Sequence, residues 1–429
     1  MAFRCESCGF SSGKWMGFCP QCGVSDPLVE IVGVAGKKTR AASSIGLKGA
    51  SERKHSRRPT GWPEIDRVLG GGVVPGSVIL LGGEPGVGKS TLLLQVAGAL
   101  ARSGAPVVVA SAEESAEQVA MRATRLGVVD DTIALISDDN VDAIIAMAEE
   151  ARPLLLVVDS IQTMGVTEIS SAPGGVAQVR ESAGRLVRFA KTTGVAVVLV
   201  GHVTKEGGLA GPKMVEHMVD VVLYLEGDPD RGFRVLRSSK NRFGATHVSG
   251  MFDMRSEGLA EVDDPSKVFL DGWESEVPGT VIYPAVEGRR SILVEVQALV
   301  SPTRQTQPRR SIRGLDPTRV NQVLAVLDRH ARLGLHDQEV YVNVVGGWKI
   351  EEPGSDLAVA LAVASSARDR ALGKMAAWGE IGLAGEVRTI PMETRRLEEL
   401  DRMGLERRIA PIGGSPMRLL DALVEAGLD

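Results

Sequence analysis

A glycine-rich loop between an apolar run and a helical stretch constrains this chain more than any other feature. The segment VILLGG ends at position 83 and leads into GEPGVGKST. The spacing G-x-x-x-x-G-K-S, with a strand before it and a helix after it, is typical of a P-loop. Backbone amides of such a loop surround nucleotide phosphates, Lys89 reaches the β- and γ-phosphate oxygens, and the Ser90 hydroxyl ligates Mg²⁺. The predicted ATP-binding residues are Gly83, Glu84, Pro85, Gly86, Val87, Gly88, Lys89, Ser90 and Thr91.

Apolar runs alternate with helical stretches on both sides of this loop. We expect strands over 77–81, 106–110, 154–159, 195–200, 219–225 and 233–238. We expect helices over 90–102, 115–126, 142–151 and 176–192. Buried strands that alternate with helices form a mostly parallel sheet, so the predicted fold class is α/β. Aromatic residues make up only 4% of the chain and glycines number 50, which favours aliphatic cores with close backbone approaches.

Two carboxylates are predicted to serve the P-loop. Asp159 ends an apolar run, so it is expected at the carboxyl edge of the sheet, where it can hold Mg²⁺ together with Ser90. Glu113 follows the second strand and can polarise the attacking water. The plain alternatives are a turn residue for Asp159 and a helix-dipole contact for the glutamates, which suits Glu114 better than Glu113.

All four cysteines lie within the first 22 residues as two C-x-x-C pairs, each followed by glycine. Four thiolates in a tetrahedron suit Zn²⁺, and the unit is too small to fold without the metal. Two disulfides or a redox pair are the alternatives. Disulfides fit poorly with a chain that shows no secretory signal, and a redox pair would be a single C-x-x-C beside a βαβ unit. The predicted zinc ligands are Cys5, Cys8, Cys19 and Cys22.

The net charge of −5 conceals two basic segments. Residues 31–58 carry eight lysines or arginines against one glutamate, without periodicity, and predict a flexible basic linker between a zinc finger at 1–30 and the ATPase region. Residues 301–320 carry five arginines against one aspartate, among prolines and glutamines, and predict a mobile basic stretch that suits phosphates. A solvated linker and loop would show the same composition.

Three motifs add a family resemblance. They are TGWPEIDRVLGGG at 60–72, GHVTKEG at 201–207 and KNRFG at 240–244. The pattern is similar to the RecA-like ATPases, which include RecA, DnaB-type helicases and KaiC. The three motifs and the cysteine pairs together resemble the RadA (Sms) family of bacterial DNA-repair proteins over essentially the whole chain.

The resemblance implies roles that the residues alone do not give. It assigns Glu113 as the water-activating glutamate, His202 as the γ-phosphate sensor, and Lys240 and Arg242 as cations inserted into a neighbouring subunit's ATP site. It also implies a RecA-like ATPase domain over 59–266, a hexameric ring, and action on single-stranded and branched DNA alongside RecA. Without it, Lys240 and Arg242 would be solvated charges after an edge strand.

Two loops on the nucleotide edge of the sheet, 164–178 and 204–212, are expected to line the channel of such a ring and to contact single-stranded DNA. They hold few charges and no aromatic side chain, so the expected contacts are to the DNA backbone. The predicted DNA-binding residues are Arg180, Lys205, Arg304, Arg309, Arg310, Arg313, Arg319 and Lys349.

Residues 267–429 resemble the proteolytic domain of Lon, through YVNVVGGWKI at 341–350 and EPGSDLA at 352–358. Alignment puts Asp356 at the nucleophile position, with Ser355 one residue early, and puts Thr394 at the general-base position, followed by Arg395. Arginine does not deprotonate in proteins, so no Ser–Lys dyad can form. The RadA family shares this loss, so the resemblance implies an inactive domain that serves oligomerisation and DNA binding rather than an ATP-dependent peptidase.

No run of 18 apolar residues occurs and the N-terminus has no apolar signal region, so we expect no membrane partner and a cytoplasmic location. The predicted function is an ATP-dependent DNA motor in recombinational repair, with helicase-like translocation or branch migration. The alternative is a KaiC-like scaffold or signalling ring that binds ATP without acting as a motor.

Overall fold

The computed structural model describes residues 2–5, 7, 10–12, 14–25, 28–31, 56–202, 212–227, 232–246, 248–288, 290–305 and 307–429. The chain divides into two compact units, residues 1–54 and 55–429. Cys8, Lys205, most of the predicted linker and most of the 204–212 loop lie outside the described residues. Arg57 and Arg58, the last residues of the predicted linker, belong to the larger unit.

The smaller unit is a three-stranded antiparallel sheet of order β2-β1-β3, formed by β1 (Ala2–Cys5), β2 (Ser11–Ser12) and β3 (Leu28–Ile31). Two backbone hydrogen bonds close its turns, from the Cys5 amide to the Phe10 carbonyl at 2.7 Å and from the Cys19 amide to the Val24 carbonyl at 2.9 Å. The sheet and these turns bring cysteines from both halves of the unit together.

The larger unit begins with a nine-stranded sheet of order β12-β11-β10-β9-β4-β8-β7-β5-β6. Six of its strands are parallel: β4 (Val78–Gly83), β5 (Val107–Ser111), β6 (Ile133–Ile136), β7 (Leu155–Asp159), β8 (Ala196–His202) and β9 (Val221–Glu226). Three antiparallel strands extend it: β10 (Phe233–Asn241), β11 (Ser249–Arg255) and β12 (Gly258–Glu261). The predicted strands are all present, whereas β6, β11 and β12 were not expected.

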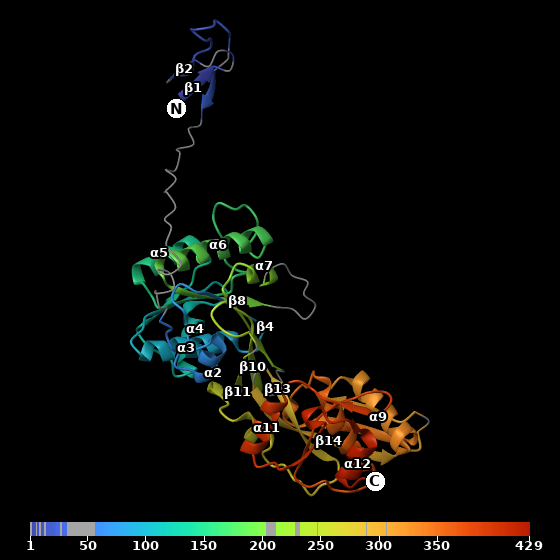
Figure 1. Cartoon of the computed structure of the whole chain (residues 1–429). Coiled ribbons are helices and arrows are strands. Elements are labelled where there is room, and N and C mark those ends of the chain that lie inside the picture. Colours follow the sequence, from blue (N-terminus) through green and yellow to red (C-terminus); the bar gives the residue numbers. More distant parts are fainter. Residues whose placement is uncertain are drawn as a thin grey trace. The chain divides into compact units, whose positions relative to one another are not determined.

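Helices cover both faces of this sheet, as Figure 1 shows. On one face lie α2 (Pro63–Leu69), α3 (Lys89–Arg102) and α4 (Ala116–Arg125), and on the other lie α5 (Val141–Ala151), α6 (Val176–Thr193) and α7 (Pro212–Glu216). Strand β4 serves both cores, because successive side chains of a strand point to opposite faces. Ile79 and Leu81 pack in the core on the α3 side, and Val78 and Leu80 pack in the core on the α6 side.

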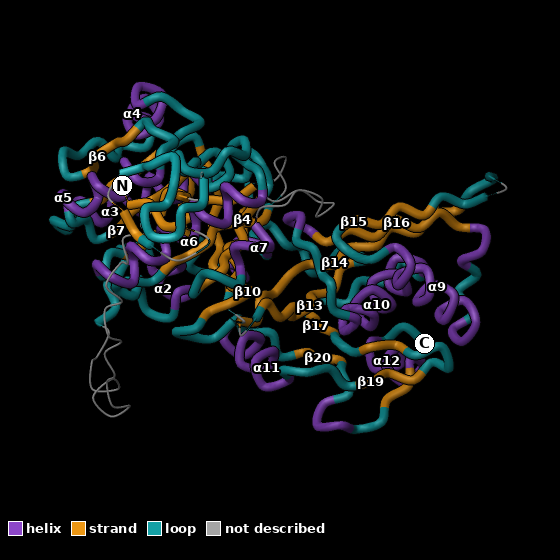
Figure 2. Tube along the Cα trace, turned by 90° about the horizontal axis from the view of Figure 1, so that it is seen from above, coloured by secondary structure: helices purple, strands orange, loops and turns teal. Residues whose placement is uncertain are grey.

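The C-terminal part of the larger unit holds a second, mixed sheet of order β15-β16-β14-β13-β17-β20. Its strands are β13 (Thr280–Glu287), β14 (Arg290–Pro302), β15 (Arg310–Arg313), β16 (Gln338–Val344), β17 (Met375–Ala377) and β20 (Arg407–Ile409). Figure 2 shows α9 (Pro317–Ala331) and α10 (Asp356–Ala367) beside these strands. Helix α10 is buried along its first ten residues, which explains its apolar sequence on every side.

A small sheet of β18 (Glu380–Ile381), β19 (Glu386–Arg388) and β21 (Met417–Arg418) completes this part, together with α8 (Pro265–Phe269), α11 (Glu393–Arg402) and α12 (Leu419–Ala426). Among the helices that the structure describes, none has the length and apolar composition needed to cross a membrane.

The prediction of a mobile basic stretch over 301–320 was wrong for half of its length, which lies in strands and a helix. Residues 310–313 form the edge strand β15, which pairs in parallel with β16, and α9 begins at Pro317. Asp316 caps this helix through a hydrogen bond from the Arg319 amide at 2.8 Å. The prolines and glutamines suggested a loop, but one proline occupies the first turn of a helix, where it is well tolerated.

Candidate nucleotide and metal sites

The P-loop joins β4 to α3, as its sequence predicts. The Lys89 ammonium donates hydrogen bonds to the carbonyls of Gly83 at 2.9 Å and Glu84 at 3.0 Å. Gly88 has a φ of +113°, at which a side chain would be strained, and a Cβ there would lie 2.6 Å from Cε of Met254 and displace it. Burial lowers the pKa of Lys89, and the negative charges of Asp159 and Glu113 partly oppose this shift. The protonated, cationic form of Lys89 is the one that phosphates would bind.

Ser90 and Asp159 meet at the carboxyl ends of β4 and β7, where the Ser90 hydroxyl donates to Oδ2 of Asp159 at 2.6 Å. Burial raises the pKa of Asp159, and the hydrogen bond from Ser90 opposes that shift. A hydroxyl and a carboxylate are oxygen ligands of the kind that Mg²⁺ prefers, so this pair fits the predicted ion. Ser90 and Asp159 are 69 positions apart in the sequence, and the parallel strands bring them together at the carboxyl edge of the sheet.

Glu113 and His202 lie at the same edge. Nε2 of His202 is 3.4 Å from Oε1 of Glu113, and its Nδ1 is 3.4 Å from Nζ of Lys89. Glu114 instead forms an ion pair with Arg122 on α4. The two neighbouring glutamates therefore have different partners. Glu113 faces the P-loop, whereas Glu114 binds a residue of α4.

Three residues at this edge were missed by sequence reasoning. The Ser160 hydroxyl donates to Oε1 of Glu113 at 2.5 Å, and the Gln162 side-chain amide donates to the His202 carbonyl at 3.3 Å. Nε of the buried Arg234, on β10, donates to the Val87 carbonyl in the P-loop at 3.0 Å. Of these three residues, only Ser160 could have been suspected from the sequence, because it directly follows Asp159.

Lys240 and Arg242 lie at the edge of the sheet where the parallel strands begin. The P-loop lies at the opposite edge, where those strands end. Strand β10 runs antiparallel to β9, so its end at Asn241 pairs with Val221 at the start of β9. Nζ of Lys240 donates to the Glu216 carbonyl at 2.7 Å. Burial, and then the charge of Arg242, lower the pKa of Lys240.

Asp220 holds Arg242 at this edge. Nη1 of Arg242 lies 3.2 Å from Oδ1 of Asp220, whose Oδ2 accepts hydrogen bonds from Lys191 at 2.5 Å and from the Val78 amide at 3.0 Å. Burial alone would raise the pKa of Asp220, but these hydrogen bonds bring it below its ordinary value. The Asp220 side chain is 5% exposed, whereas the Arg242 side chain is 55% exposed and keeps access to solvent.

Three of the four predicted zinc ligands gather in the smaller unit. The thiol sulfurs of Cys5, Cys19 and Cys22 all lie within 4.8 Å of one another, and those of Cys5 and Cys22 are 3.6 Å apart. A disulfide needs about 2.05 Å between sulfurs, whereas thiolates about 2.3 Å from a tetrahedral Zn²⁺ lie about 3.8 Å apart. The spacing of the described cysteine sulfurs fits zinc and does not fit a disulfide.

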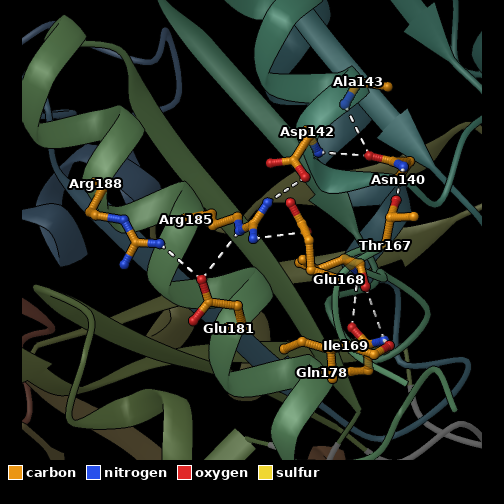
Figure 3. Close-up of polar contacts among 11 residues, drawn as sticks. Asn140, Asp142, Ala143, Thr167, Glu168, Ile169, Gln178, Glu181, Arg185 and Arg188 are labelled. Atoms are coloured by element: carbon orange, nitrogen blue, oxygen red, sulfur yellow. Dashed lines mark hydrogen bonds and ion pairs between the residues drawn. The ribbon is translucent and has the colours of Figure 1, made fainter. Parts of the chain in front are cut away.

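The predicted DNA loop over 164–178 is tied to its surroundings by two side chains of α6, drawn in Figure 3. Oε1 of the buried Gln178 accepts from the Val166 amide at 2.9 Å, and its Nε2 donates to the Ile169 carbonyl at 2.9 Å. Arg185 binds Glu168 of the loop at 3.0 Å. The base of the loop is thereby fixed, and Arg180 on the same helix is exposed.

The basic residues of the C-terminal part divide into two groups. Arg304, Arg309, Arg310, Arg313 and Lys349 are exposed, although Lys349 also pairs with Glu351 at 3.0 Å. Arg319 is different, because it forms ion pairs with Asp356 and with Glu380. Its charge is already neutralised inside the domain, so we no longer count Arg319 among the candidate DNA contacts.

The position that corresponds to the Lon nucleophile holds a structural residue. Asp356 is 2% exposed, binds Arg319, and accepts a hydrogen bond from the Ile381 amide at 2.9 Å. The neighbouring Ser355 hydroxyl donates to the Glu352 carbonyl at 3.4 Å. Arg395 forms an ion pair with Glu398 on α11. The contacts of Asp356 and Ser355 are those of a packed interior rather than of an activated nucleophile, and the Arg395 pair is exposed.

Comparisons with known proteins agree with this architecture. Residues 54–208 match an AAA domain, and residues 3–30 match a rubredoxin metal-binding domain. The first match, on a P-loop sheet of this topology, confirms the predicted RecA-like ATPase core and implies ATP with Mg²⁺. The second match and the three clustered thiols indicate Zn²⁺.

Curated relatives match almost the whole chain. The DNA repair protein RadA of Pseudomonas aeruginosa is 48% identical over 96% of this chain and 93% of its own length. That of Escherichia coli is 46% identical over 97% and 94%, and that of Bacillus subtilis is 45% identical over 95% and 92%. Identity at this level over nearly the full length of both proteins means that the chain belongs to the RadA family of DNA repair proteins.

Proposed function

We propose that this chain is a DNA-stimulated ATPase that works as a ring in homologous recombination and repair, where it moves along single-stranded or branched DNA. The observation that carries the proposal is the separation of the two halves of the ATP site. The P-loop lies at one edge of the sheet, and Lys240 and Arg242 lie at the other. A complete site therefore needs two copies of the chain.

The separation can be estimated from the strands. Val221 and Tyr224 on β9 pair with Ile79 and Gly82 on β4, and Asn241 pairs with Val221. Asn241 of the KNRFG turn therefore lies four residues from the end of β4 at Gly83, which is about 13 Å along a strand. An arginine side chain does not span that distance through the packed sheet. The cations can serve a phosphate only at a neighbour's P-loop, which supports the trans assignment.

Within one site, each residue has a distinct role. Lys89 binds the β- and γ-phosphate oxygens, and Ser90 and Asp159 hold Mg²⁺, which neutralises phosphate charge when bound. Glu113 orients the attacking water and accepts its proton, with Ser160 holding the carboxylate. His202 links Glu113 to Lys89 and so senses the γ-phosphate. The 3.4 Å contacts of His202 on both sides support this role.

DNA is bound through its phosphates. Arg180, the fixed loop over 164–178 and Lys205 of the second loop face the DNA in the ring. Arg304, Arg309, Arg310, Arg313 and Lys349 supply further exposed cations on the C-terminal domain. Cations that meet phosphates give salt-dependent binding with little sequence preference. This domain, with its Lon-like motifs, assembles the ring and holds DNA, and it is not a peptidase.

The remaining assignments follow the family: a hexameric, cytoplasmic assembly that works alongside the RecA recombinase. The domains are a zinc finger at 1–30, a linker at 31–58, the ATPase domain at 59–266 and the Lon-like domain at 267–429. The AAA-domain match and the RadA relatives support these assignments.

The rate of ATP hydrolysis with and without single-stranded DNA tests the proposal. A DNA-dependent motor predicts stimulation that falls steeply as salt is raised, because phosphate contacts release counterions. A rate indifferent to DNA at low salt would favour a KaiC-like scaffold and would contradict the motor.

A further inference from the structure

The glycine motif LGGG at 69–72 ends α2. The chain that enters the ATPase domain lies against it. The amide and carbonyl of Arg58 pair with those of Val73, both at 2.8 Å. Gly72 has a φ of +116°, and a Cβ there would lie 2.4 Å from the Arg58 carbonyl oxygen. The glycines therefore make room for the segment that carries Arg57 and Arg58.

Arg57 uses this position to join two elements. Its Nη1 donates to the Leu69 carbonyl at 3.4 Å, at the end of α2, and its Nη2 donates to the Phe243 carbonyl inside the KNRFG turn. A Cβ on Gly70 would lie 2.6 Å from the guanidinium, so the glycine motif makes room for the side chain as well. A planar guanidinium can bridge two carbonyls, and the negative end of a helix dipole favours a cation there.

The KNRFG turn has two further supports. Nδ2 of Asn241 donates to the Val68 and Leu69 carbonyls, both at 3.4 Å, and its Oδ1 accepts from the Phe243 amide at 2.9 Å. The Arg242 amide donates to the Asp220 carbonyl at 3.1 Å. Asn241 holds the start of the turn and Asp220 holds its middle, whereas Arg57 holds the carbonyl that follows Arg242.

We infer that Arg57 is a positioning residue for Lys240 and Arg242, and thus belongs to the donor half of the ATP site although it lies far from it in sequence. This inference rests on the trans function proposed above. Arg57 touches no nucleotide in its own chain or its neighbour's, and it acts by fixing the direction in which the turn presents its cations. Loss of Arg57 leaves the P-loop intact and loosens the donor turn.

Mixed oligomers test this assignment, because they report which half of the site a variant damages. Lys89→Ala damages the binding half, and Arg242→Ala damages the donor half. Arg57→Ala alone should lower turnover by at least about tenfold with ATP binding nearly unchanged, since a 1 Å misplacement of a reacting group can cost about 10² in rate. Mixed with Lys89→Ala it should regain activity, and mixed with Arg242→Ala it should regain none.

Arg58→Ala is the matched control, because it removes the same charge from the next residue, whose side chain is exposed, and should keep turnover near the wild-type value. If Arg57→Ala does not fold, Arg57→Gln, which keeps one donor, takes its place in the same mixtures. Recovery of an Arg57 variant with Arg242→Ala, or equal losses at Arg57 and Arg58, would overturn the inference.

The controls also separate this inference from the proposed function. If Lys89→Ala and Arg242→Ala fail to restore activity to each other in verified mixed oligomers, the trans function itself is wrong. If those two restore activity but Arg57→Ala and Lys89→Ala do not, the ring function stands and only the role of Arg57 is wrong.

Discussion

The two edges of the ATPase sheet are built differently and, under the proposed function, carry different halves of one reaction. At the P-loop edge, β4, β5, β7 and β8 end side by side, and parallel pairing alone brings Lys89, Glu113, Asp159 and His202 together. At the other edge, the antiparallel strand β10 returns Lys240 and Arg242 to the start of β9, where Asp220 pairs with Arg242 and Arg57 binds the Phe243 carbonyl. Under the proposed function, the comparison means that each subunit would supply half of each of two sites.

The largest effect is expected at the P-loop edge. Lys89→Ala should abolish ATP binding and hydrolysis together, because the ammonium is the cation that meets the β- and γ-phosphates. Lys89 is buried and binds two loop carbonyls, so the thermal unfolding of the variant should be recorded beside its affinity for a fluorescent ATP analogue. Unchanged nucleotide affinity would remove the phosphate-binding role from this edge.

A substitution at the opposite edge should lower the rate of ATP hydrolysis without changing the affinity for ATP. Arg242→Ala should lower the rate of hydrolysis by about 10³, since an arginine that stabilises the leaving γ-phosphate is worth about 10³ to 10⁵ in rate. ATP affinity should stay near the wild-type value, because the charge is needed mainly in the transition state. A solvated arginine would change neither quantity, so wild-type turnover would contradict a catalytic donor edge.

The two edges also differ in how far the sequence predicts them. The P-loop, Asp159 and the six main strands follow from local patterns, since each needs only a motif or an apolar run and its neighbours. Lys240 and Arg242 were placed through a family resemblance, because nothing local distinguishes them from solvated charges. Ser160, Arg234 and Arg57 escaped prediction because their partners lie 47, 147 and 186 residues away in sequence.

The arginines of the C-terminal domain are a second case in which the sequence alone does not predict the contacts of a residue. Five arginines between residues 301 and 320 look alike in sequence, but only the fold shows that α9 directs Arg319 toward the buried Asp356. Arg319→Ala should destabilise the protein by about 1–3 kcal/mol, because a buried carboxylate loses a charged hydrogen-bond partner. Arg310→Ala, on the exposed edge strand, should leave stability unchanged and weaken DNA binding.

Thermal unfolding and DNA titrations at several salt concentrations measure this difference. The salt dependence of DNA binding should become shallower for Arg310→Ala by about one counterion and stay unchanged for Arg319→Ala when the folded protein is compared. A shallower salt dependence for Arg319→Ala, with none for Arg310→Ala, would show that Arg319, and not the edge strand, contacts DNA.

The smallest effect on the ATPase domain is expected from the zinc unit. Cys19→Ser should remove zinc and unfold the smaller unit, because a domain of this size has too little core to fold without its metal. The melting of the larger unit should change by no more than about 0.5 kcal/mol, as for a substitution remote from its core. Less than one zinc per wild-type chain by metal analysis would contradict the four-thiolate site.

The most direct test of the divided site is the ATPase rate of mixed oligomers of Lys89→Ala and Arg242→Ala subunits. One variant supplies an intact P-loop edge, and the other supplies an intact donor edge. If the edges of two subunits meet in each site, an equal random mixture should contain about one quarter intact sites, because each head-to-tail interface takes one edge from each neighbour. Turnover should therefore rise to about one quarter of the wild-type value. Turnover no higher than that of either variant alone, in oligomers shown to contain both chains, would contradict the account.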